Sequence, residues 1–414
     1  MNNTYTINTD KNILTLPYFT LNRGKPFIEY IHGNSVGCYI VNEQGDLKNF
    51  SSIESGDEDI SIKPEYRKLI DANVLSCPRG IDGRTEMDDL YEMCRDWLKT
   101  VVAFGSDEEL TAATSYAVMT WFAWHYDSMP YLRFIGDYGT GKTTTLRAMS
   151  SICYRSLNIS GAISAPALFR VVNAVQGTLQ IDEADFKGSG LENQIVKILN
   201  HGYTRGVSII RLNRKSDPVA FQAFGPKIIA TRQPFKDAAL QSRCLNIKMT
   251  PRSVEGLDKL SSRHVVKRAQ AITSGLLYWR MKSSEMEGDW NLFDSSDMHL
   301  PAEYTPRVQQ LAAPLFDCTP FGRRREIESY FNSVNLDYLD ARNNGAEAQV
   351  RRVLRYELNQ MNHKLTLVQL YRQLSYDCRM KNSSKRISRI AEVLGCEKRR
   401  GKDGVVFWFR DGMV

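Results

Sequence analysis

The stretch GDYGTGKTT, residues 136–144, constrains this chain more than any other feature of its sequence. Gly136, four further residues, and then Gly141, Lys142 and Thr143 fit the pattern Gly-x-x-x-x-Gly-Lys-Ser/Thr. That pattern binds phosphates when a strand precedes it and a helix follows it. The apolar run YLRFI before the stretch predicts a strand, and TLRAMSSICY after it predicts a helix. The sequence therefore predicts a phosphate-binding loop inside an α/β fold.

In such a loop, successive backbone N–H groups turn toward the anion, and the helix that follows adds its positive N-terminal end. We expect Lys142 to reach the outer phosphates of ATP and the Thr143 hydroxyl to ligate Mg²⁺. The residues expected to contact the nucleotide are Gly136, Asp137, Tyr138, Gly139, Thr140, Gly141, Lys142, Thr143 and Thr144. The alternative is a flexible glycine-rich turn that Lys-Thr follows by chance, and a second motif downstream weighs against it.

That second motif is GTLQIDEAD, residues 177–185, in which a short apolar run ends in acidic residues. The run predicts a buried strand that delivers carboxylates to its C-terminal edge. We expect Asp182 to hold the magnesium, directly or through water, and Glu183 to polarise the attacking water. A solvated acidic helix start is the alternative. Because this motif follows a phosphate loop in the chain, it favours ATP hydrolysis.

Length, charge and cysteine content limit the class of protein. With 414 residues the chain is long enough for two or three domains, and its formal charge of +7 is compatible with an anionic partner. The 8 cysteines are scattered without a Cys-x-x-Cys pair, which favours reduced thiols over a zinc or disulfide scaffold. The start of the chain is polar and its longest apolar stretch is too short to span a bilayer, so we expect a cytoplasmic protein without membrane contact.

The residue pattern divides the chain into five segments. Residues 1–84 alternate short β-type runs with turns, which predicts a β-rich interaction module. Apolar residues recur at helical spacing in residues 85–130, the expected helical collar, and residues 253–340 are mainly helical. Between them, residues 131–252 alternate strands and helices as in an open α/β sheet. Residues 345–414 predict a winged-helix domain, with three helices and a two-stranded wing.

This last segment carries the positive excess of the chain. It holds 15 Lys and Arg against 7 Asp and Glu, a local net charge of +8. Six of these cations fall on the expected recognition helix and wing, where they would neutralise DNA phosphates. They are Lys385, Arg386, Arg389, Arg399, Arg400 and Lys402. A protein–protein module with a solvated basic face is the alternative.

A basic β-hairpin is expected inside the α/β segment. The run VSIIRL predicts an outgoing strand, NRKSD a tip and PVAFQAF a returning strand, before the apolar core strand PKIIAT. Arg214 and Lys215 at the tip suit a nucleic-acid backbone, because phosphate contact needs charge and reach but no base-specific geometry. A solvated hairpin tip is the alternative.

Phosphate loop, Asp-Glu strand, inserted basic hairpin and the run ALQSRCLNIKM together resemble the AAA+ ATPases of the hairpin-inserted helicase branch. That branch includes the minichromosome maintenance (MCM) helicases and the superfamily 3 viral helicases. The chain is most similar to the MCM-like replicative helicases of bacterial mobile genetic elements, such as staphylococcal cassettes and prophages. The resemblance covers roughly residues 130–315, and the terminal winged helix matches the usual extra domain.

The resemblance implies roles for three further residues. Thr231, at the end of the strand after the hairpin, matches the first sensor position that helps to place the attacking water, where members of the branch usually have asparagine. Arg243 resembles the arginine that enters the neighbouring subunit's site, and Arg307 resembles the second sensor arginine of the MCM type. An arginine donated in trans makes hydrolysis depend on assembly, so the implied active form is a hexameric ring.

The resemblance thus implies a DNA helicase that uses ATP and Mg²⁺, translocates on single-stranded DNA and unwinds forked duplex during replication of a mobile element. Replication proteins would bind the N-terminal module. Two alternatives stay open: a replication initiator or helicase loader that uses ATP for assembly on DNA, and a DNA-binding regulator that ATP switches. A loader would keep origin binding after charge reversal at Arg214 and Lys215, and a regulator would tolerate Glu183→Gln.

Overall fold

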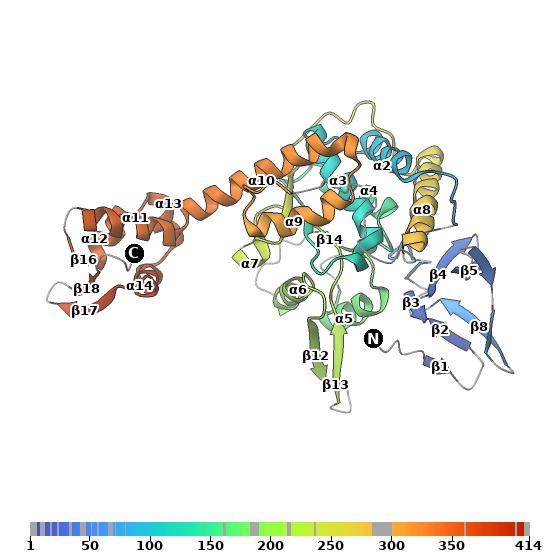
Figure 1. The fold of residues 1–414 in the computed structure, drawn as a ribbon, viewed down its shortest axis with the longest axis horizontal. Helices are drawn as coiled ribbons and strands as arrows, with labels where there is room; N and C mark the ends of the chain where they lie inside the picture. Colours follow the sequence, from blue (N-terminus) through green and yellow to red (C-terminus); the bar gives the residue numbers. More distant parts are fainter. Residues whose placement is uncertain are drawn as a thin grey trace. The chain divides into compact units, whose positions relative to one another are not determined.

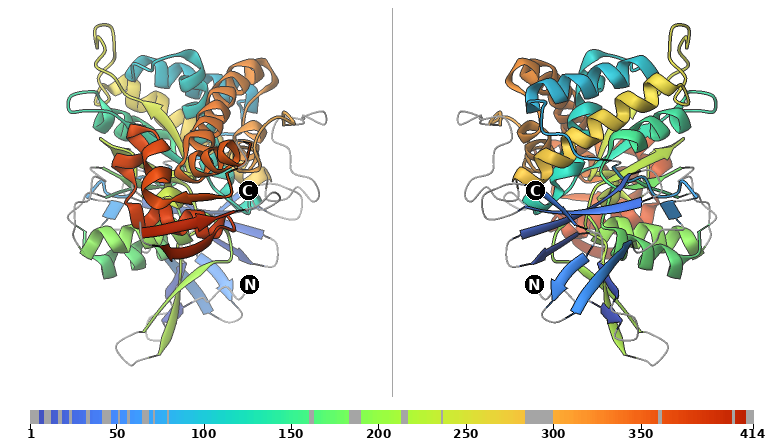
Figure 2. Two further views of the ribbon diagram at one scale, coloured as in Figure 1. Left: turned by 90° about the vertical axis from the view of Figure 1, so that its left-hand side faces the viewer. Right: turned by 90° about the vertical axis from the view of Figure 1, so that its right-hand side faces the viewer.

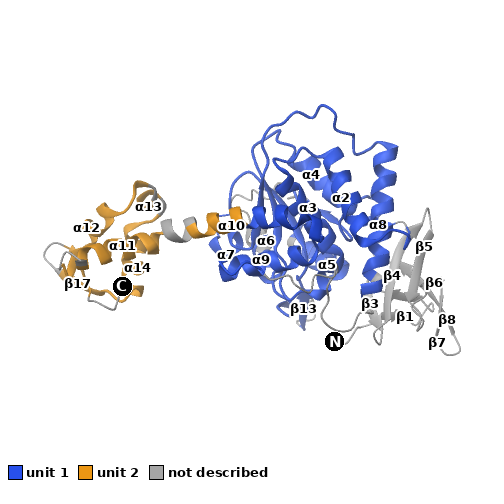
Figure 3. Ribbon diagram, turned by 45° about the horizontal axis from the view of Figure 1, so that its top comes forward, with its two compact units in different colours: residues 1–331 blue, residues 332–414 orange. Residues whose placement is uncertain are grey.

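The structure, a computed structural model, divides into two compact units, residues 1–331 and residues 332–414, which are described separately (Figures 1 and 3). Within the described residues, no helix combines the length and the apolar character needed to cross a membrane. The residues that the structure describes are 6–8, 13–16, 19–22, 25–32, 35–41, 47–50, 52–55, 58–64, 69–70, 72–78, 80–159, 163–182, 190–212, 217–235, 237–283, 300–359, 362–401 and 404–409.

Short strands occupy the first part of the chain, where the sequence predicts β structure. They form two four-stranded sheets with the orders β1-β2-β8-β7 and β3-β4-β5-β6. The pair β2 and β8 is parallel, whereas β4 and β5 form an antiparallel ladder. The strands are β1 Thr6–Asn8, β2 Ile13–Leu16, β3 Phe19–Asn22, β4 Lys25–His32, β5 Ser35–Val41, β6 Leu47–Phe50, β7 Ser52–Ser55 and β8 Glu58–Pro64.

A five-stranded parallel sheet with the order β10-β11-β14-β9-β15 forms the centre of the first unit. Its strands are β9 Tyr131–Ile135, β10 Leu157–Ile159, β11 Leu179–Ile181, β14 Lys227–Thr231 and β15 Cys244–Lys248. β14 is buried along its whole length, as expected for a strand covered on both faces. All five strands run in one direction, so their C-terminal ends meet at one edge of the sheet. The prediction of an α/β core is confirmed, and the structure adds that its sheet is parallel.

Helices surround this sheet and supply most of the apolar core. In α2 the apolar residues that recur at three- and four-residue spacing, Leu90, Cys94, Trp97, Leu98 and Val101, are buried, while Met93 is half-buried. α2 packs against α3 and α8, and α4 packs against α8 (Figure 2). The helices are α2 Met87–Val101, α3 Asp107–Met119, η1 Thr120–His125, α4 Lys142–Ile152, α5 Ala165–Val175, α6 Gly190–His201, α7 Ala238–Gln241, α8 Arg263–Ser283, α9 Pro306–Asp317, η2 Phe321–Arg323 and α10 Arg324–Asn344.

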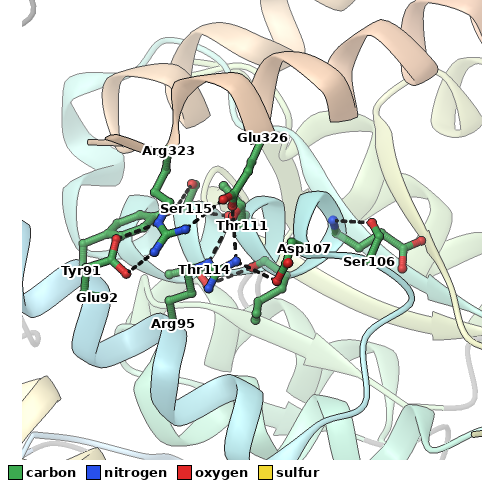
Figure 4. A network of polar contacts seen from close by, with 12 residues as sticks. Tyr91, Glu92, Arg95, Ser106, Asp107, Thr111, Thr114, Ser115, Arg323 and Glu326 are labelled. Atoms are coloured by element: carbon green, nitrogen blue, oxygen red, sulfur yellow. Dashed lines mark hydrogen bonds and ion pairs between the residues drawn. The ribbon is translucent and has the colours of Figure 1, made fainter. Parts of the chain in front are cut away.

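A polar network joins helices α2 and α3 to the start of α10 (Figure 4). The Arg95 guanidinium, in a side chain that is 5% exposed, donates to Glu326 Oε2 at 3.3 Å, and the Thr111 hydroxyl donates to the same oxygen. Arg323 donates to Glu326 Oε1 and to both carboxylate oxygens of Glu92, each at 2.8 Å. Burial disfavours the charged form of Glu326, but Thr111, Arg323 and Arg95 outweigh it, so the pKa of this carboxyl lies below its usual value.

Within the described residues, the second unit contains the C-terminal part of α10, helices α11 to α14 and a three-stranded antiparallel sheet of order β16-β18-β17. Its apolar core includes Leu354, Leu370, Ile387 and Phe407. The sequence predicts α11, α12, α14 and the β17–β18 hairpin, but misses β16 and α13. The elements are α11 Ala346–Asn359, β16 Lys364–Thr366, α12 Leu367–Gln373, α13 Tyr376–Lys381, α14 Ser384–Val393, β17 Glu397–Gly401 and β18 Gly404–Trp408.

No metal cluster or disulfide lies within the described part of the chain. No group of three or more His, Cys, Asp or Glu side chains there is placed to hold a metal ion. None of the cysteines with described side chains is in a disulfide, and most of them are buried. They are Cys77, Cys94, Cys153, Cys244, Cys318, Cys378 and Cys396.

Candidate active site

The loop between β9 and α4 has the backbone conformation that phosphate binding requires. Gly139 and Gly141 have φ angles of 69° and 84°, in the left-handed region that glycine adopts at little cost. A Cβ atom at Gly136 would lie 2.2 Å from the Met249 carbonyl oxygen, so only glycine fits where the loop leaves the sheet. Gly141 is the N-cap of α4, so the positive end of this helix faces the loop. A polyphosphate fits this combination of features.

Lys142, the first residue of α4, folds back over the loop. Its Nζ donates to the carbonyl oxygens of Gly136 and Asp137, at 2.6 Å each. The Thr140 hydroxyl also donates to the Asp137 carbonyl oxygen, at 2.8 Å. The ammonium group thus lies over the first turn of the loop, within reach of an anion bound there. Thr143 is exposed one residue further along the helix, where its hydroxyl is accessible to a metal ion.

Asp182 lies at the same edge of the sheet as the phosphate loop. It directly follows β11, and its N–H donates to the Ile159 carbonyl oxygen at 3.1 Å, which extends the pairing of β11 with β10 by one residue. One strand, β14, separates β11 from β9. The order of the strands therefore brings Asp182 and the loop together across a single intervening strand. Glu183 lies outside the described residues.

Thr231 ends that intervening strand. Its carbonyl oxygen accepts a hydrogen bond from the Gly136 N–H at 3.2 Å, which ties the start of the phosphate loop to β14. The side chain is 1% exposed, and its hydroxyl has no hydrogen-bond partner among the described residues. A buried hydroxyl left without a partner costs about 1–3 kcal/mol. Such an unsatisfied group, between the loop and Asp182, fits a ligand or a held water at this edge.

Arg232 belongs to this site although the sequence pattern did not single it out. Its guanidinium lies 4.7 Å from the centre of the Tyr138 ring and donates to the Tyr138 hydroxyl. Tyr138 belongs to the phosphate loop and is 77% exposed. The one sequence feature that could have indicated Arg232 is its place directly after Thr231, at the C-terminal end of a core strand. The contact itself joins residues 94 positions apart.

Arg243 and Arg307 lie together at the end of the sheet where its strands begin, opposite the end that carries the phosphate loop. Arg243 directly precedes β15, whose first residue is paired with Tyr131, the first residue of β9. The two guanidinium groups lie 5.5 Å and 5.4 Å from the centre of the Tyr203 ring. Arg243 is level with residue 130, six residues before Gly136, and a strand rises about 3.3 Å per residue, so the Arg243 backbone lies about 20 Å from the start of the phosphate loop of its own chain. Sequence reasoning missed Tyr203, whose contact with both arginines only the tertiary structure shows.

The hairpin between α6 and β14 consists of β12 (Ser208–Leu212) and β13 (Pro218–Gln222), in the register Ser208↔Gln222 to Leu212↔Pro218. One face packs on α5, where the Phe221 and Phe169 ring centres are 6.3 Å apart and the Arg211 guanidinium lies 4.0 Å from the Phe169 ring centre. In Figures 1 and 2 the paired strands extend away from the parallel sheet. Arg214 and Lys215, at the expected tip, lie outside the described residues.

A buried lysine ties the base of this hairpin to the sheet. Lys227 Nζ donates to the carbonyl oxygens of Gly202, Ala223 and Gly225, at 3.2, 2.8 and 2.9 Å. It also lies 5.0 Å from the centre of the Tyr131 ring. Burial disfavours the charged form and lowers the pKa of Lys227 to about 7. One side chain thus connects the end of α6, the return of the hairpin and the start of β14.

In the second unit, the basic residues predicted to contact DNA lie on α14 and β17. Lys385, Arg386 and Arg389 are exposed on α14, and Arg399 and Arg400 are exposed on β17. Lys402 lies outside the described residues. Arg399 forms an ion pair with Glu397 at 2.9 Å, and its guanidinium lies 5.4 Å from the Trp408 ring centre. The charge of Arg399 is therefore partly balanced, whereas the three cations on α14 form an exposed basic helix face.

Comparison with known proteins adds little to this geometry. No protein-family model and no curated protein matches the chain. Among solved structures, it is similar to the JCV helicase, with 14% identity and a TM-score of 0.29 over 60% of this chain and 60% of that chain. It is also similar to the NrS-1 C-terminal region, with 10% identity and a TM-score of 0.39 over 92% and 96% of the two chains. The chain thus spans about 60% of the JCV helicase, and values this low do not assign it to a family.

Proposed function

We propose that this chain is an ATP-dependent DNA helicase of the MCM-like type, which assembles as a ring, translocates on single-stranded DNA and serves the replication of a bacterial mobile element. The observation that carries the proposal is the set of residues at the C-terminal ends of three strands of the parallel sheet. There the glycine-rich loop before α4, Thr231 at the end of β14 and Asp182 after β11 lie on three adjacent strands. ATP hydrolysis needs these functions together: phosphate binding, metal binding and a polar group beside the attacking water.

The residues of this edge have distinct roles in the proposed reaction. The loop N–H groups, the N-terminus of α4 and Lys142 hold the phosphates. Thr143 and Asp182 would hold Mg²⁺, which neutralises phosphate charge when it is bound. Glu183 accepts a proton from the attacking water and orients it, while the buried Thr231 hydroxyl donates or accepts the hydrogen bond that it lacks. This division supports hydrolysis rather than nucleotide binding alone.

Assembly completes the site in this proposal. Arg243 and Arg307 lie at the sheet edge opposite the loop of their own chain, so neither is placed to serve that loop. In a ring, this edge faces the pocket of a neighbouring subunit, where a guanidinium stabilises the charge that develops on the transferred phosphoryl group. The shared contact with Tyr203 supports a joint role for the two arginines. Hydrolysis then requires a hexamer or a similar closed ring.

Two basic elements supply the proposed DNA contacts. Arg214 and Lys215 on the hairpin would follow the backbone of a strand in the central channel. The second unit, as a winged helix with Lys385, Arg386 and Arg389 on its recognition helix, would bind duplex DNA. The N-terminal strands would bind replication proteins. Movement of the hairpins with successive ATP turnovers would draw the strand through the ring.

An unwinding assay tests the proposal. The full chain is incubated with ATP, Mg²⁺ and forked duplexes that carry a 3′ or a 5′ tail, and strand release is followed beside ATP hydrolysis. Wild type should do both, Lys142→Ala should do neither, and charge reversal at Arg214 and Lys215 should abolish strand release. Charge reversal at Arg268, an exposed arginine on α8, is the matched control and should leave both activities intact. A wild-type protein that binds origin DNA without strand release would support a loader instead, and an active Glu183→Gln variant would support a regulator.

A further inference from the structure

Two cations, not one, contact the first residues of the phosphate loop. Lys142 Nζ lies 2.6 Å from the carbonyl oxygens of Gly136 and Asp137, and the Arg232 guanidinium binds the next residue, Tyr138, through both ring and hydroxyl. Both positive groups are thus held by three consecutive loop residues. The sequence motif accounts for the lysine alone, so the arginine needs an explanation of its own.

The backbone fixes where Arg232 starts. Thr231 is paired with Ile135, the last residue of β9, and its carbonyl oxygen binds the Gly136 N–H. Arg232 therefore leaves β14 beside the first residue of the loop and on the strand between the loop and Asp182. We expect this edge to face the outer phosphates, because in such a loop the backbone N–H groups cradle the inner phosphates and the lysine reaches the outer ones. The outer phosphate is the part of ATP that ADP lacks.

The contact between Arg232 and Tyr138 suits an exchange of partners. A tyrosine ring and a neutral hydroxyl are weaker partners for a guanidinium than phosphate oxygens, which accept two charge-assisted hydrogen bonds from its planar fork. Tyr138 is 77% exposed, so the contact can open without the loss of buried core packing. Lys142 offers the same exchange, from loop carbonyl oxygens to phosphate.

We propose that Arg232 contacts the γ-phosphate of ATP bound in its own subunit, and that Tyr138 holds the guanidinium over the loop before nucleotide binds. This inference rests on the proposed function, because it requires ATP in the loop. It assigns to the chain a cation that acts in cis, in addition to Arg243 and Arg307, which act in trans in the proposed ring. Arg232 then contributes, within its own subunit, to the distinction between ATP and ADP.

The test compares the affinities of two nucleotides by isothermal titration calorimetry on the full chain with Mg²⁺. The probes are ADP and a non-hydrolysable ATP analogue with a β,γ-imido bridge. Arg232→Gln should weaken binding of the analogue by about tenfold, the loss expected for a hydrogen bond to a charged group, while ADP affinity stays within about twofold of wild type. Tyr138→Phe keeps the ring but removes the hydroxyl that competes for the guanidinium, so it should bind the analogue at least as tightly as wild type.

The other possible outcomes of the titrations distinguish failure of this inference from failure of the proposed function. Equal weakening of both nucleotides, or no change in either, would show that Arg232 only supports the loop, and would overturn this inference while the proposed function stands. A wild-type protein that binds neither nucleotide would overturn the proposed function itself. Arg268→Gln, on the exposed face of α8, is the matched control and should alter neither affinity. If Arg232→Gln does not fold, Arg232→Lys, which keeps the charge but loses the planar fork, carries the same comparison.

Discussion

Two inactive variants of this chain should restore ATP hydrolysis when they are mixed. Lys142→Ala disables the pocket of its own subunit and keeps Arg243. Arg243→Ala keeps its own pocket and loses the arginine proposed to serve the neighbouring pocket. The paired starts of β9 and β15 put the Arg243 backbone about 20 Å from the start of the phosphate loop of its own chain, beyond direct contact with a nucleotide there. If Arg243 serves a neighbouring pocket, a subunit of each kind completes one working site between them.

The expected recovery follows from random assembly of an equal mixture. A working site needs its pocket from an Arg243→Ala subunit and its arginine from a Lys142→Ala subunit, and each condition is met at half of the positions. About one quarter of the sites are then complete, so independent sites would give about a quarter of the wild-type rate. Each variant alone should retain about a thousandth of the wild-type rate or less. For Arg243→Ala the reason is that an arginine finger contributes a factor of about 10³–10⁵ to turnover.

Steady-state phosphate release, measured against the mixing ratio with single-stranded DNA present, is the assay. Light scattering on the same samples reports whether mixed assemblies form. The matched control replaces Arg243→Ala by the double variant Lys142→Ala, Arg243→Ala, which has no intact pocket and should give no recovery. The reasoning is refuted if mixed assemblies form and the rate never exceeds the average of the two parents.

Three further predictions follow from contacts of the first unit. Gly136→Ala should abolish nucleotide binding, because its Cβ would lie 2.2 Å from the Met249 carbonyl oxygen; wild-type affinity in a calorimetric titration would contradict this. Between about pH 7 and pH 10 the unfolded state keeps the Lys227 proton that the folded state has lost. As the pH rises through this range, the unfolding free energy of wild type should therefore increase by a few kcal/mol relative to that of Lys227→Met. Urea unfolding checks this, and a pH-independent difference would argue against it. Glu326→Ala removes a partner of buried Arg95 and should lower the unfolding free energy by about 1–3 kcal/mol, whereas Glu347→Ala, which breaks an exposed pair with Arg351, should cost less than about 1 kcal/mol by the same urea titration.

The sequence by itself determined the elements whose information is local. The glycine spacing around residues 136–144 requires a curled backbone before a helix, and α4 begins at Lys142, within the motif. Apolar runs before polar residues predicted β9, β11 and β14, because a strand buried on both faces needs such a run. β16, with three residues, and α13, with six, were missed because elements this short show no readable period.

Only the tertiary structure decided which of these residues meet. Asp182 and Thr231 lie beside the loop because β14 pairs with both β9 and β11, a choice that depends on packing between segments far apart in the chain. The contact between Tyr138 and Arg232 and the shared contact of Arg243 and Arg307 with Tyr203 have no local pattern. The physical reason is that periodicity and turn chemistry act over a few residues, whereas strand order and side-chain contacts come from the burial of the whole core.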